Sequence, residues 1–238
     1  MPTAEQEKIV PLLSQNRNIS SNYSSQTINA QPLTSPPSEI DAGMWTNYQF
    51  DGFDYYMCPG TLTVSGQGTA YYYLTTHIGC GSGGCAEIGV NHTAWDSSHY
   101  WIYTYSQNDN PHWGFTNIQV EYNYGHEYSI YTNQDRDSNG YKYVAVFDGQ
   151  VIRTMHMTSL NCQISQCLEA HDYPGCQYSD DTNPAQFWHQ SLMDSGGAYV
   201  WWDSSIPDAS GTPRHDYPTQ LYRYIYGSSW DDEMWVQN

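Results

Sequence analysis

The chain has 238 residues, with 7 Lys and Arg against 25 Asp and Glu, so its formal net charge is −18. Phosphate backbones and anionic lipids attract basic surfaces, and this charge therefore argues against nucleic-acid binding and against docking on a membrane. Aromatic residues make up 16% of the chain, chiefly 23 Tyr and 9 Trp, which favour strands. No apolar run approaches the ~20 residues of a membrane span. The composition indicates a secreted, extracellular β-protein with a neutral polar surface.

The first 40 residues differ in composition from the rest. They are rich in Ser, Asn, Gln and Pro, and only the stretch 4–14 has the apolar residues of a short helix. Pro and Ser over 35–38 are typical of a linker. We therefore expect an irregular N-terminal arm over 1–40, a pro-segment remnant or a strap, and one β-domain over 41–238.

After residue 43, short strand patterns alternate with turn signals, a spacing typical of an antiparallel sandwich or barrel. The expected strands are 45–50, 53–57, 60–66, 69–76, 85–92, 99–106, 116–122, 126–133, 141–147, 150–157, 166–171, 186–193, 198–203 and 220–226. The clearest hairpin has Asp148-Gly149 between two alternating runs, because Gly accepts the positive φ of a two-residue turn. A second hairpin is expected to join 116–122 to 126–133.

The six cysteines are Cys58, Cys80, Cys85, Cys162, Cys167 and Cys176. An even count in a chain of this composition predicts three disulfides. The Gly-rich gap favours a local Cys80–Cys85 bridge. Cys162 and Cys167 are equally close in sequence, and Cys58–Cys176 would then be a long-range bridge. Other pairings stay open, and the spacing lacks the Cys-x-x-Cys pairs typical of zinc sites.

Two glutamates lie inside strand patterns, Glu87 in 85–92 and Glu169 in 166–171. In both segments apolar residues occupy the alternate positions, so both carboxyl groups are expected on the side opposite the packed face. Two carboxyl groups on one face of a sheet repel each other, which raises the pKa of one and suits the pair to general acid–base catalysis. Two solvent-facing glutamates with no such role are the simpler alternative.

Aromatic side chains are the candidates for substrate binding. Trp101, Tyr103 and Tyr105 share one face of the expected strand 99–106, because side chains alternate along a strand. Trp113 follows after a short turn, and Trp201 and Trp202 lie near the C-terminus. Rings of this kind hold sugars or peptides, and packing between sheets is the alternative role.

An Asp-x-Asp-x-Asn-Gly run is the one candidate metal site in the sequence. Asp135, Asp137 and Asn139 place oxygens at alternate positions, and Gly140 follows at the sharp turn, as in the first half of a calcium loop. Val146 stands where such a loop has its last Glu. A structural calcium ion and a plain Asp/Asn/Gly turn are the two interpretations.

The order of strands and turns over about 60–175 resembles that of the glutamic peptidases, the eqolisins and their neprosin-like relatives. The corresponding segments are the strand Tyr71–Ile78 with its loop Gly79–Gly84, the strand Cys85–His92, the aromatic strand Tyr100–Tyr105, the hairpins 116–133 and 141–157, and the strand Cys167–His171. The resemblance implies an all-β, antiparallel, concanavalin-like jelly-roll sandwich. It also implies that Glu87 and Glu169 occupy the two catalytic positions.

The function that the resemblance implies is a secreted, acid-active endopeptidase. Glu87 and Glu169 would activate water and protonate the leaving amine of a polypeptide, without a cofactor other than a structural calcium ion. A carbohydrate-binding or carbohydrate-cleaving sandwich is the alternative, with a polysaccharide as partner, because retaining glycosidases also use two carboxyl groups. A non-catalytic extracellular structural protein is the third interpretation.

Overall fold

The computed structural model describes the chain from Glu39 to Val236, except for residues 47, 62, 65–70, 80, 94–95, 172–175, 178–184, 203–205, 207–213, 216–220 and 227–230. For 39–45, 63–64, 71–73, 96–97, 167–171, 176–177, 214–215, 221–226 and 231–236 it describes the backbone alone. The expected helix over 4–14, and the N-terminal arm as far as residue 38, lie outside this part. Within it, no helix is long and apolar enough to cross a membrane.

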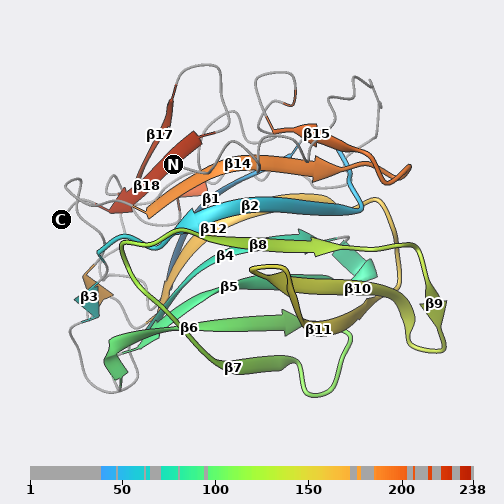
Figure 1. Cartoon of the computed structure of the whole chain (residues 1–238), viewed down its shortest axis with the longest axis horizontal. Helices are drawn as coiled ribbons and strands as arrows, with labels where there is room; N and C mark the ends of the chain where they lie inside the picture. The colour runs from blue at the N-terminus through green and yellow to red at the C-terminus, as the bar shows by residue number, and fades with distance from the viewer. Residues whose placement is uncertain are drawn as a thin grey trace, which may run out of the picture.

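The described chain is built of antiparallel strands in two large sheets (Figure 1). The first sheet has the order β16 (Arg214–His215), β1 (Glu39–Trp45), β12 (Gln163–His171), β4 (Tyr71–Gly79), β5 (Cys85–Thr93), β6 (Asp96–Ser106) and β7 (Trp113–Val120). The second has the order β11 (Gln150–Met157), β10 (Gly140–Phe147), β8 (His126–Tyr131), β2 (Gly52–Cys58), β14 (Ala185–Met193), β18 (Asp231–Val236) and β17 (Leu221–Tyr226). The expected β-sandwich is confirmed.

Four short strands and one helical turn complete the described elements. Strand β15 (Tyr199–Trp201) pairs with β14, and β9 (Arg136–Asp137) pairs with β10. Strands β3 (Thr63–Val64) and β13 (Cys176–Gln177) pair with each other outside the two sheets. A 3-10 turn, η2 (Gly81–Gly83), lies between β4 and β5.

The core lies between the two sheets and follows the period of two that strands impose. In β2 the buried residues Phe53, Tyr55 and Met57 alternate with half-buried ones, and Tyr55 stacks on Tyr128 of β8 with ring centroids 5.5 Å apart. In β5 the side chain of Ile88 is fully buried. Each such side chain contributes about 1.5–3 kcal/mol on full burial. The apolar positions of β5 therefore face the core, as the sequence predicts, and Glu87 faces outward.

The predicted hairpin at Asp148-Gly149 is confirmed. Strand β10 pairs with β11, and the two turn residues have φ of 46° and 74°, as a two-residue turn between twisted strands requires. The hairpin expected from 116–122 to 126–133 is wrong. Strand β7 pairs with β6 in the first sheet, whereas β8 pairs with β2 and β10 in the second. The turn between β7 and β8 therefore passes from one sheet to the other.

The cysteines do not pair as expected. Cys58 and Cys85 are thiols, so the predicted Cys80–Cys85 and Cys58–Cys176 bridges are wrong. The Cys58 thiol is buried and donates to the carbonyl oxygen of Tyr122 at 3.1 Å. Cys85 lies in β5, where it pairs with Gly79 across the β4–β5 hairpin. Cys162 is disulfide-bonded. The expected Cys162–Cys167 bridge stays a prediction, because the side chain of Cys167 lies outside the described part.

Candidate functional site

The outward face of the first sheet gathers the polar and aromatic candidates around Glu87. Glu87 pairs with His77 of β4 on one side and with Tyr105 of β6 on the other. Residues directly opposite each other in antiparallel strands project from the same face. The register therefore places an imidazole, a carboxyl group and a phenol side by side. Cys85 joins them because it lies two residues before Glu87 on the same strand.

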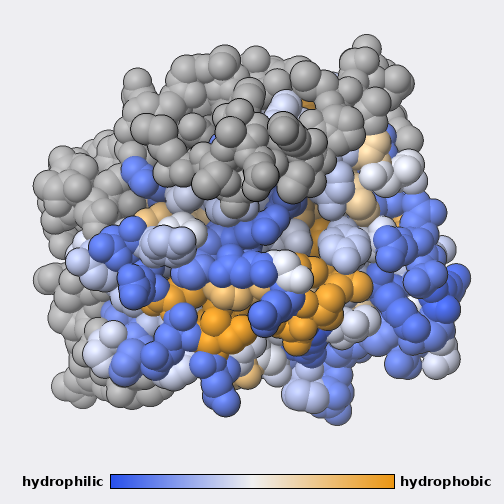
Figure 2. Space-filling model, viewed as in Figure 1, coloured by the Kyte–Doolittle hydropathy of each residue, from blue (hydrophilic) through white to orange (hydrophobic). Residues whose placement is uncertain are grey.

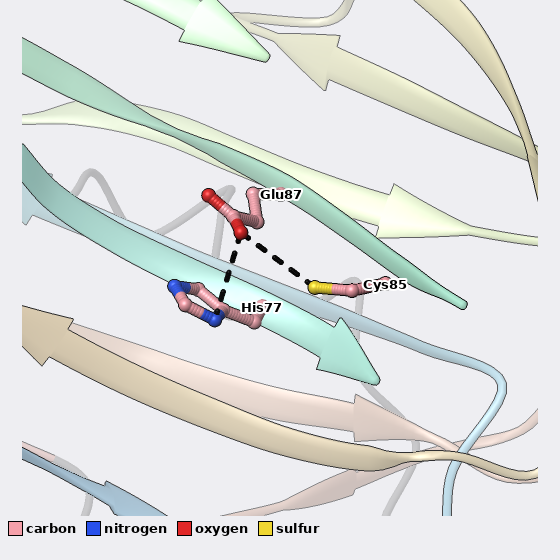
Figure 3. A group of neighbouring side chains, drawn as sticks. All are labelled: His77, Cys85 and Glu87. Atoms are coloured by element: carbon pink, nitrogen blue, oxygen red, sulfur yellow. Dashed lines mark hydrogen bonds and ion pairs between the residues drawn. The ribbon is translucent and has the colours of Figure 1, made fainter. Parts of the chain in front are cut away.

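Figure 3 shows how three of these side chains converge. The Oε1 atom of Glu87 lies 3.8 Å from Nδ1 of His77 and 3.6 Å from Sγ of Cys85. The other carboxylate oxygen, Oε2, accepts a long hydrogen bond of 3.5 Å from the hydroxyl of Tyr103. The side chains of His77 and Glu87 are 18% and 13% exposed. The group is thus half-buried, held by its neighbours and still reachable from solvent.

Four rings extend this face beyond Glu87, and we call them the aromatic shelf: Tyr103, Tyr105, Trp113 and Phe115. The ring of Trp113 lies 4.8 Å from that of Tyr105 and stacks on that of Phe115 at 5.9 Å. Trp113 is 40% exposed and Phe115 is 63% exposed. Exposed rings at the edge of a sheet cost free energy unless they serve contact with another molecule, so the shelf is a candidate binding surface.

The phenol of Tyr105 is a hydrogen-bond donor at this site. Burial above all raises the pKa of Tyr105 above its ordinary value, and the nearby acidic groups of Glu87 and Cys85 raise it further when they are ionised. The phenol therefore stays protonated over the whole acid and neutral range, and it can donate to an oxygen that gains negative charge. Tyr103 is fully buried, yet it lies outside the cluster of residues that packs between the sheets.

The structure brings most of the predicted substrate-binding residues together. Tyr103, Tyr105 and Trp113 all belong to the shelf. Trp101 lies on the same strand as Tyr105 but four residues away, paired with Asn91 of β5 and with its ring 5.6 Å from that of His99. It is therefore at the far end of the face. Phe115 also belongs to the shelf, since it lies two residues after Trp113 on β7 and projects from the same face. The sequence did not predict it as a binding residue, because the expected strand began at residue 116.

The register does not bring Glu169 beside Glu87. Glu169 pairs with Tyr73 on β4, whereas Glu87 pairs with His77, four residues further along that same strand. Four residues span about 13 Å along a strand, and two strand spacings add about 10 Å across the sheet. The two Cα atoms are thus about 16 Å apart. The expected pair of carboxyl groups stays a prediction, because the side chain of Glu169 lies outside the described part of the chain.

His77 and Cys85 were not predicted as partners of Glu87. The Gly-rich loop Gly79–Gly84 could have predicted them, because it closes a hairpin. A hairpin with its centre near Ser82 pairs residues whose numbers add up to 164, and this places His77 opposite Glu87. The observed register of β4 and β5 follows that rule along its whole length.

The candidate calcium loop forms a turn whose central carboxylate already has protein partners. One oxygen of Asp137 accepts from the backbone N–H of Asn139 at 2.8 Å, and the other lies 3.2 Å from Nε2 of His156 and 3.5 Å from Nζ of Lys142. These contacts lower the pKa of Asp137, the hydrogen bond from Asn139 most of all. They favour the turn interpretation, and calcium binding stays a prediction.

Chelation tests the calcium hypothesis. An ion held by Asp135, Asp137 and Asn139 stabilises the folded state by about 3 kcal/mol when its concentration exceeds its Kd about 100-fold. Excess chelator should then lower the melting temperature of the wild-type chain and leave that of Asp135→Asn unchanged. Identical melting curves with and without chelator would leave only the turn.

The aromatic shelf makes a prediction of its own. Replacing Trp113 by Ala removes an exposed ring that supports no core packing, so the melting temperature should change little. If the shelf holds a bound chain, the KM for its substrate should rise by about tenfold, because one aromatic contact contributes on the order of 1 kcal/mol or more. Val151→Ala is the control. Val151 is an exposed apolar residue of β11, outside the shelf, and its replacement should leave KM unchanged.

The opposite side of the sandwich offers a different surface. Figure 2 shows hydrophilic groups over much of the visible face, with an apolar area in the region of β10 and β11. Val151 is the large exposed apolar side chain of that hairpin. Among the described residues, imidazole, thiol and carboxyl groups converge at His77, Cys85 and Glu87 and not in this area, so the site on the first sheet is the stronger candidate.

Comparison with known proteins supplies the family context. No protein-family model matches this sequence. No curated protein matches it either. Among solved structures, scytalido-glutamic peptidase bound to a peptide-based transition state analog is 12% identical with a TM-score of 0.57, over 84% of this chain and 98% of that one. SCP-B, an eqolisin-family peptidase in a complex with the tripeptide Ala-Ile-His, is 12% identical with a TM-score of 0.54, over the same shares.

A β-glucanase from Bacillus licheniformis is also similar, at 14% identity, but its TM-score is only 0.35 over 81% of this chain and 68% of that one. A similarity of that size carries no argument about function. The match covers 98% of the length of each of the two peptidases. The chain therefore has the double-sheet β-sandwich fold of the glutamic peptidases.

Proposed function

We propose that this chain is an acid-active peptidase whose reaction takes place on the outward face of the first sheet, at Glu87. The observation that carries the proposal is the position of Glu87 itself. It is a half-buried carboxyl group set between His77 and Tyr105, and it is bordered by the aromatic shelf, of which Trp113 and Phe115 are exposed. The sandwich fold shared with peptidases supports the same reading, although fold alone does not assign a reaction.

The chemistry needs one group that takes a proton from water and one that gives a proton to the leaving amine. A single carboxyl group can do both in turn. Glu87 accepts a proton as the water oxygen forms its bond to the peptide carbon, and returns that proton to the amine nitrogen as the carbon–nitrogen bond breaks. The phenol of Tyr105 donates to the carbonyl oxygen that becomes negative in between. Tyr103 holds Oε2 of Glu87 and so orients the carboxyl group.

Glu169 is the second carboxyl group that the sequence suggests for catalysis, and we assign it no step of the reaction. Its Cα atom is about 16 Å from that of Glu87, and the position of its side chain lies outside the described part of the chain. Peptide hydrolysis is the reaction that we propose, because the solved structures reported above with a TM-score over 0.5 are peptidases.

Action outside the cell is part of the proposal and rests on composition. Few charges, many Tyr and Trp residues and a strongly negative net charge suit a secreted enzyme in acid surroundings. Cys58 and Cys85 are thiols. Because it is disulfides that indicate an oxidising, extracellular compartment, these two residues give the proposal of secretion no support.

The test is an assay of the purified chain on a denatured protein over the acid range, about pH 2 to 6, where carboxyl groups titrate. A panel of polysaccharides is run beside it. We expect peptide fragments and no released sugar. Absence of proteolysis throughout this range would refute the peptidase proposal, and release of sugar would assign the shelf to carbohydrate.

A further inference from the structure

His77, Cys85 and Glu87 each offer one donor atom, a nitrogen, a sulfur and an oxygen, all within 4.8 Å of one another. We propose that these three residues form a binding site for a divalent cation of the zinc class. In Figure 3 the three side chains point toward a common space beside the β4–β5 hairpin.

The distances between the donor atoms fit a tetrahedral ion. Zinc binds sulfur at about 2.3 Å and nitrogen or oxygen at about 2.0–2.2 Å, so ligand atoms around it lie about 3.3–3.6 Å apart. Here the sulfur–oxygen distance is 3.6 Å and the nitrogen–oxygen distance is 3.8 Å. The third distance, between nitrogen and sulfur, is at most 4.8 Å. Side-chain rotations that move these atoms by about an ångström or less bring all three into the coordination sphere.

The identity of the donors selects the class of ion. Calcium and magnesium prefer sites made of oxygen alone, whereas a thiolate with an imidazole and a carboxylate suits zinc and its first-row neighbours. Binding displaces the thiol proton of Cys85, and the net charge of −18 favours the approach of a cation.

The hairpin prepares the site before an ion arrives. Cys85 and Glu87 lie two residues apart on β5, and His77 is the direct partner of Glu87 on β4, so the backbone hydrogen bonds of one strand pair fix all three positions. The carboxylate is also oriented, because Tyr103 holds Oε2 while Oε1 faces the other two donors. A hydrogen bond from outside the coordination sphere of this kind typically improves affinity 10- to 100-fold.

Space for a fourth ligand lies beside Cys85. Its direct partner on β4 is Gly79, and among the described residues nothing comes within 4 Å of a Cβ built at that position. A water molecule can complete the tetrahedron there. Three protein ligands and one open position are the arrangement of exchangeable zinc sites rather than of closed structural ones.

The ion has a consequence for the reaction, and this consequence rests on the proposed function. The Oε1 atom of Glu87 cannot hold a cation and take a proton from water at the same time. Bound zinc therefore inhibits peptide hydrolysis, and a chelator restores it. Binding itself is independent of any activity, so the two claims fail separately.

Titration with Co²⁺, a spectroscopic substitute for zinc, tests the site in the full-length chain. We expect the visible bands of tetrahedral Co²⁺ together with a near-ultraviolet thiolate-to-cobalt charge-transfer band, both removed by zinc. Cys85→Ser should abolish the charge-transfer band, and His77→Gln should weaken affinity by about tenfold or more. Cys58→Ser removes the other described thiol and His99→Gln removes a histidine of β6, and both should leave the spectrum unchanged.

Circular dichroism of each variant shows whether it is folded. If Cys85→Ser does not fold, His77→Gln carries the test through its affinity and its altered visible bands. Absence of a charge-transfer band in the wild type, or its survival in folded Cys85→Ser, would overturn the proposal. A charge-transfer band in a chain that cleaves no peptide would keep the metal site and refute only the proposed function.

Discussion

Replacing Glu87 by Gln is expected to reduce the rate of peptide hydrolysis by about 100-fold or more, the usual contribution of general acid–base catalysis. Gln keeps the shape of the side chain and can still contact Tyr103, but it cannot accept a proton from water. The loss should therefore appear in kcat, while KM and the melting temperature stay close to those of the wild type. The measurement is the initial rate of cleavage of a denatured protein by equal amounts of folded enzyme.

Glu169→Gln is the informative companion to this substitution. Because the register places Glu169 about 16 Å from Glu87, we expect it to retain most of the activity. Glu121→Gln, at an exposed glutamate of the turn after β7, is the control for the loss of one negative charge. Equal losses in Glu87→Gln and Glu169→Gln would restore the pair of carboxyl groups, and full activity in Glu87→Gln would remove this residue from the mechanism.

The second large effect is on stability. The free energy of unfolding is expected to fall as the pH rises from about 4 to about 8, because Asp54 of β2 is protonated in the folded chain. Burial above all, with the negative charge of Glu127 nearby, raises the pKa of Asp54 from 3.8 to about 8. Its Oδ1 atom is buried and has no hydrogen-bond partner in the part of the chain that the structure describes.

The sign follows from proton binding. Between these two pKa values the folded state holds a proton on Asp54 and the unfolded state does not, so each step up in pH favours unfolding. The stabilising effect is complete below about pH 4 and is lost as the pH rises through about 8, at up to ~1.4 kcal/mol per pH unit. A fold of this kind is most stable in the acid range where we expect the enzyme to work.

Asp54→Asn tests this directly. The amide is uncharged at every pH, so the variant should lose the slope and should be more stable than the wild type near neutral pH. Asp135→Asn is the control, because that side chain is exposed in the folded chain. Urea denaturation at several pH values between about 4 and 8 gives the slopes. Parallel slopes for wild type and Asp54→Asn would show that this group is ionised in the folded protein.

What the sequence could predict was local. Asp148-Gly149 specifies its turn through two residues that accept positive φ, and the hairpin around it is present. The outward position of Glu87 follows from the apolar residues beside it, because alternation along one strand needs no knowledge of the neighbouring strand. The all-β class follows in the same way, from many short alternating segments separated by turns, whereas the choice of a sandwich over a barrel came from the resemblance to the glutamic peptidases.

What the sequence could not predict was how the strands pair. The segments that become β7 and β8 have the alternation of a hairpin, and only the pairing of β8 with β2 and β10 shows that they belong to different sheets. Strand β18 was missed because it begins with Asp231, Asp232 and Glu233, which hide its apolar end. Alternation along each strand predicts that Glu87 and Glu169 lie on the outward face of the sheet. It does not predict how far apart they lie along the strand direction.

The cysteines show the same limit. Spacing along the chain favoured a bridge from Cys80 to Cys85, whereas the β4–β5 pairing puts Cys85 beside Gly79 and close to the Glu87 carboxylate. Only the pairing of β4 with β5 shows that His77 lies beside Glu87. Contacts between strands depend on the packing of the whole sandwich, and no single segment encodes them.

The central claim is that a polypeptide binds on the outward face of the first sheet, beside Glu87. The most direct test is the paramagnetic broadening of the indole NMR signals of ¹⁵N-tryptophan-labelled Glu87→Gln protein by a spin-labelled peptide at saturating concentration. The account predicts strong broadening of Trp113, on the aromatic shelf, and none of Trp188, which stacks on Tyr56 of the second sheet with ring centroids 6.0 Å apart. Broadening of Trp188 with Trp113 unaffected, or of neither signal, would contradict it.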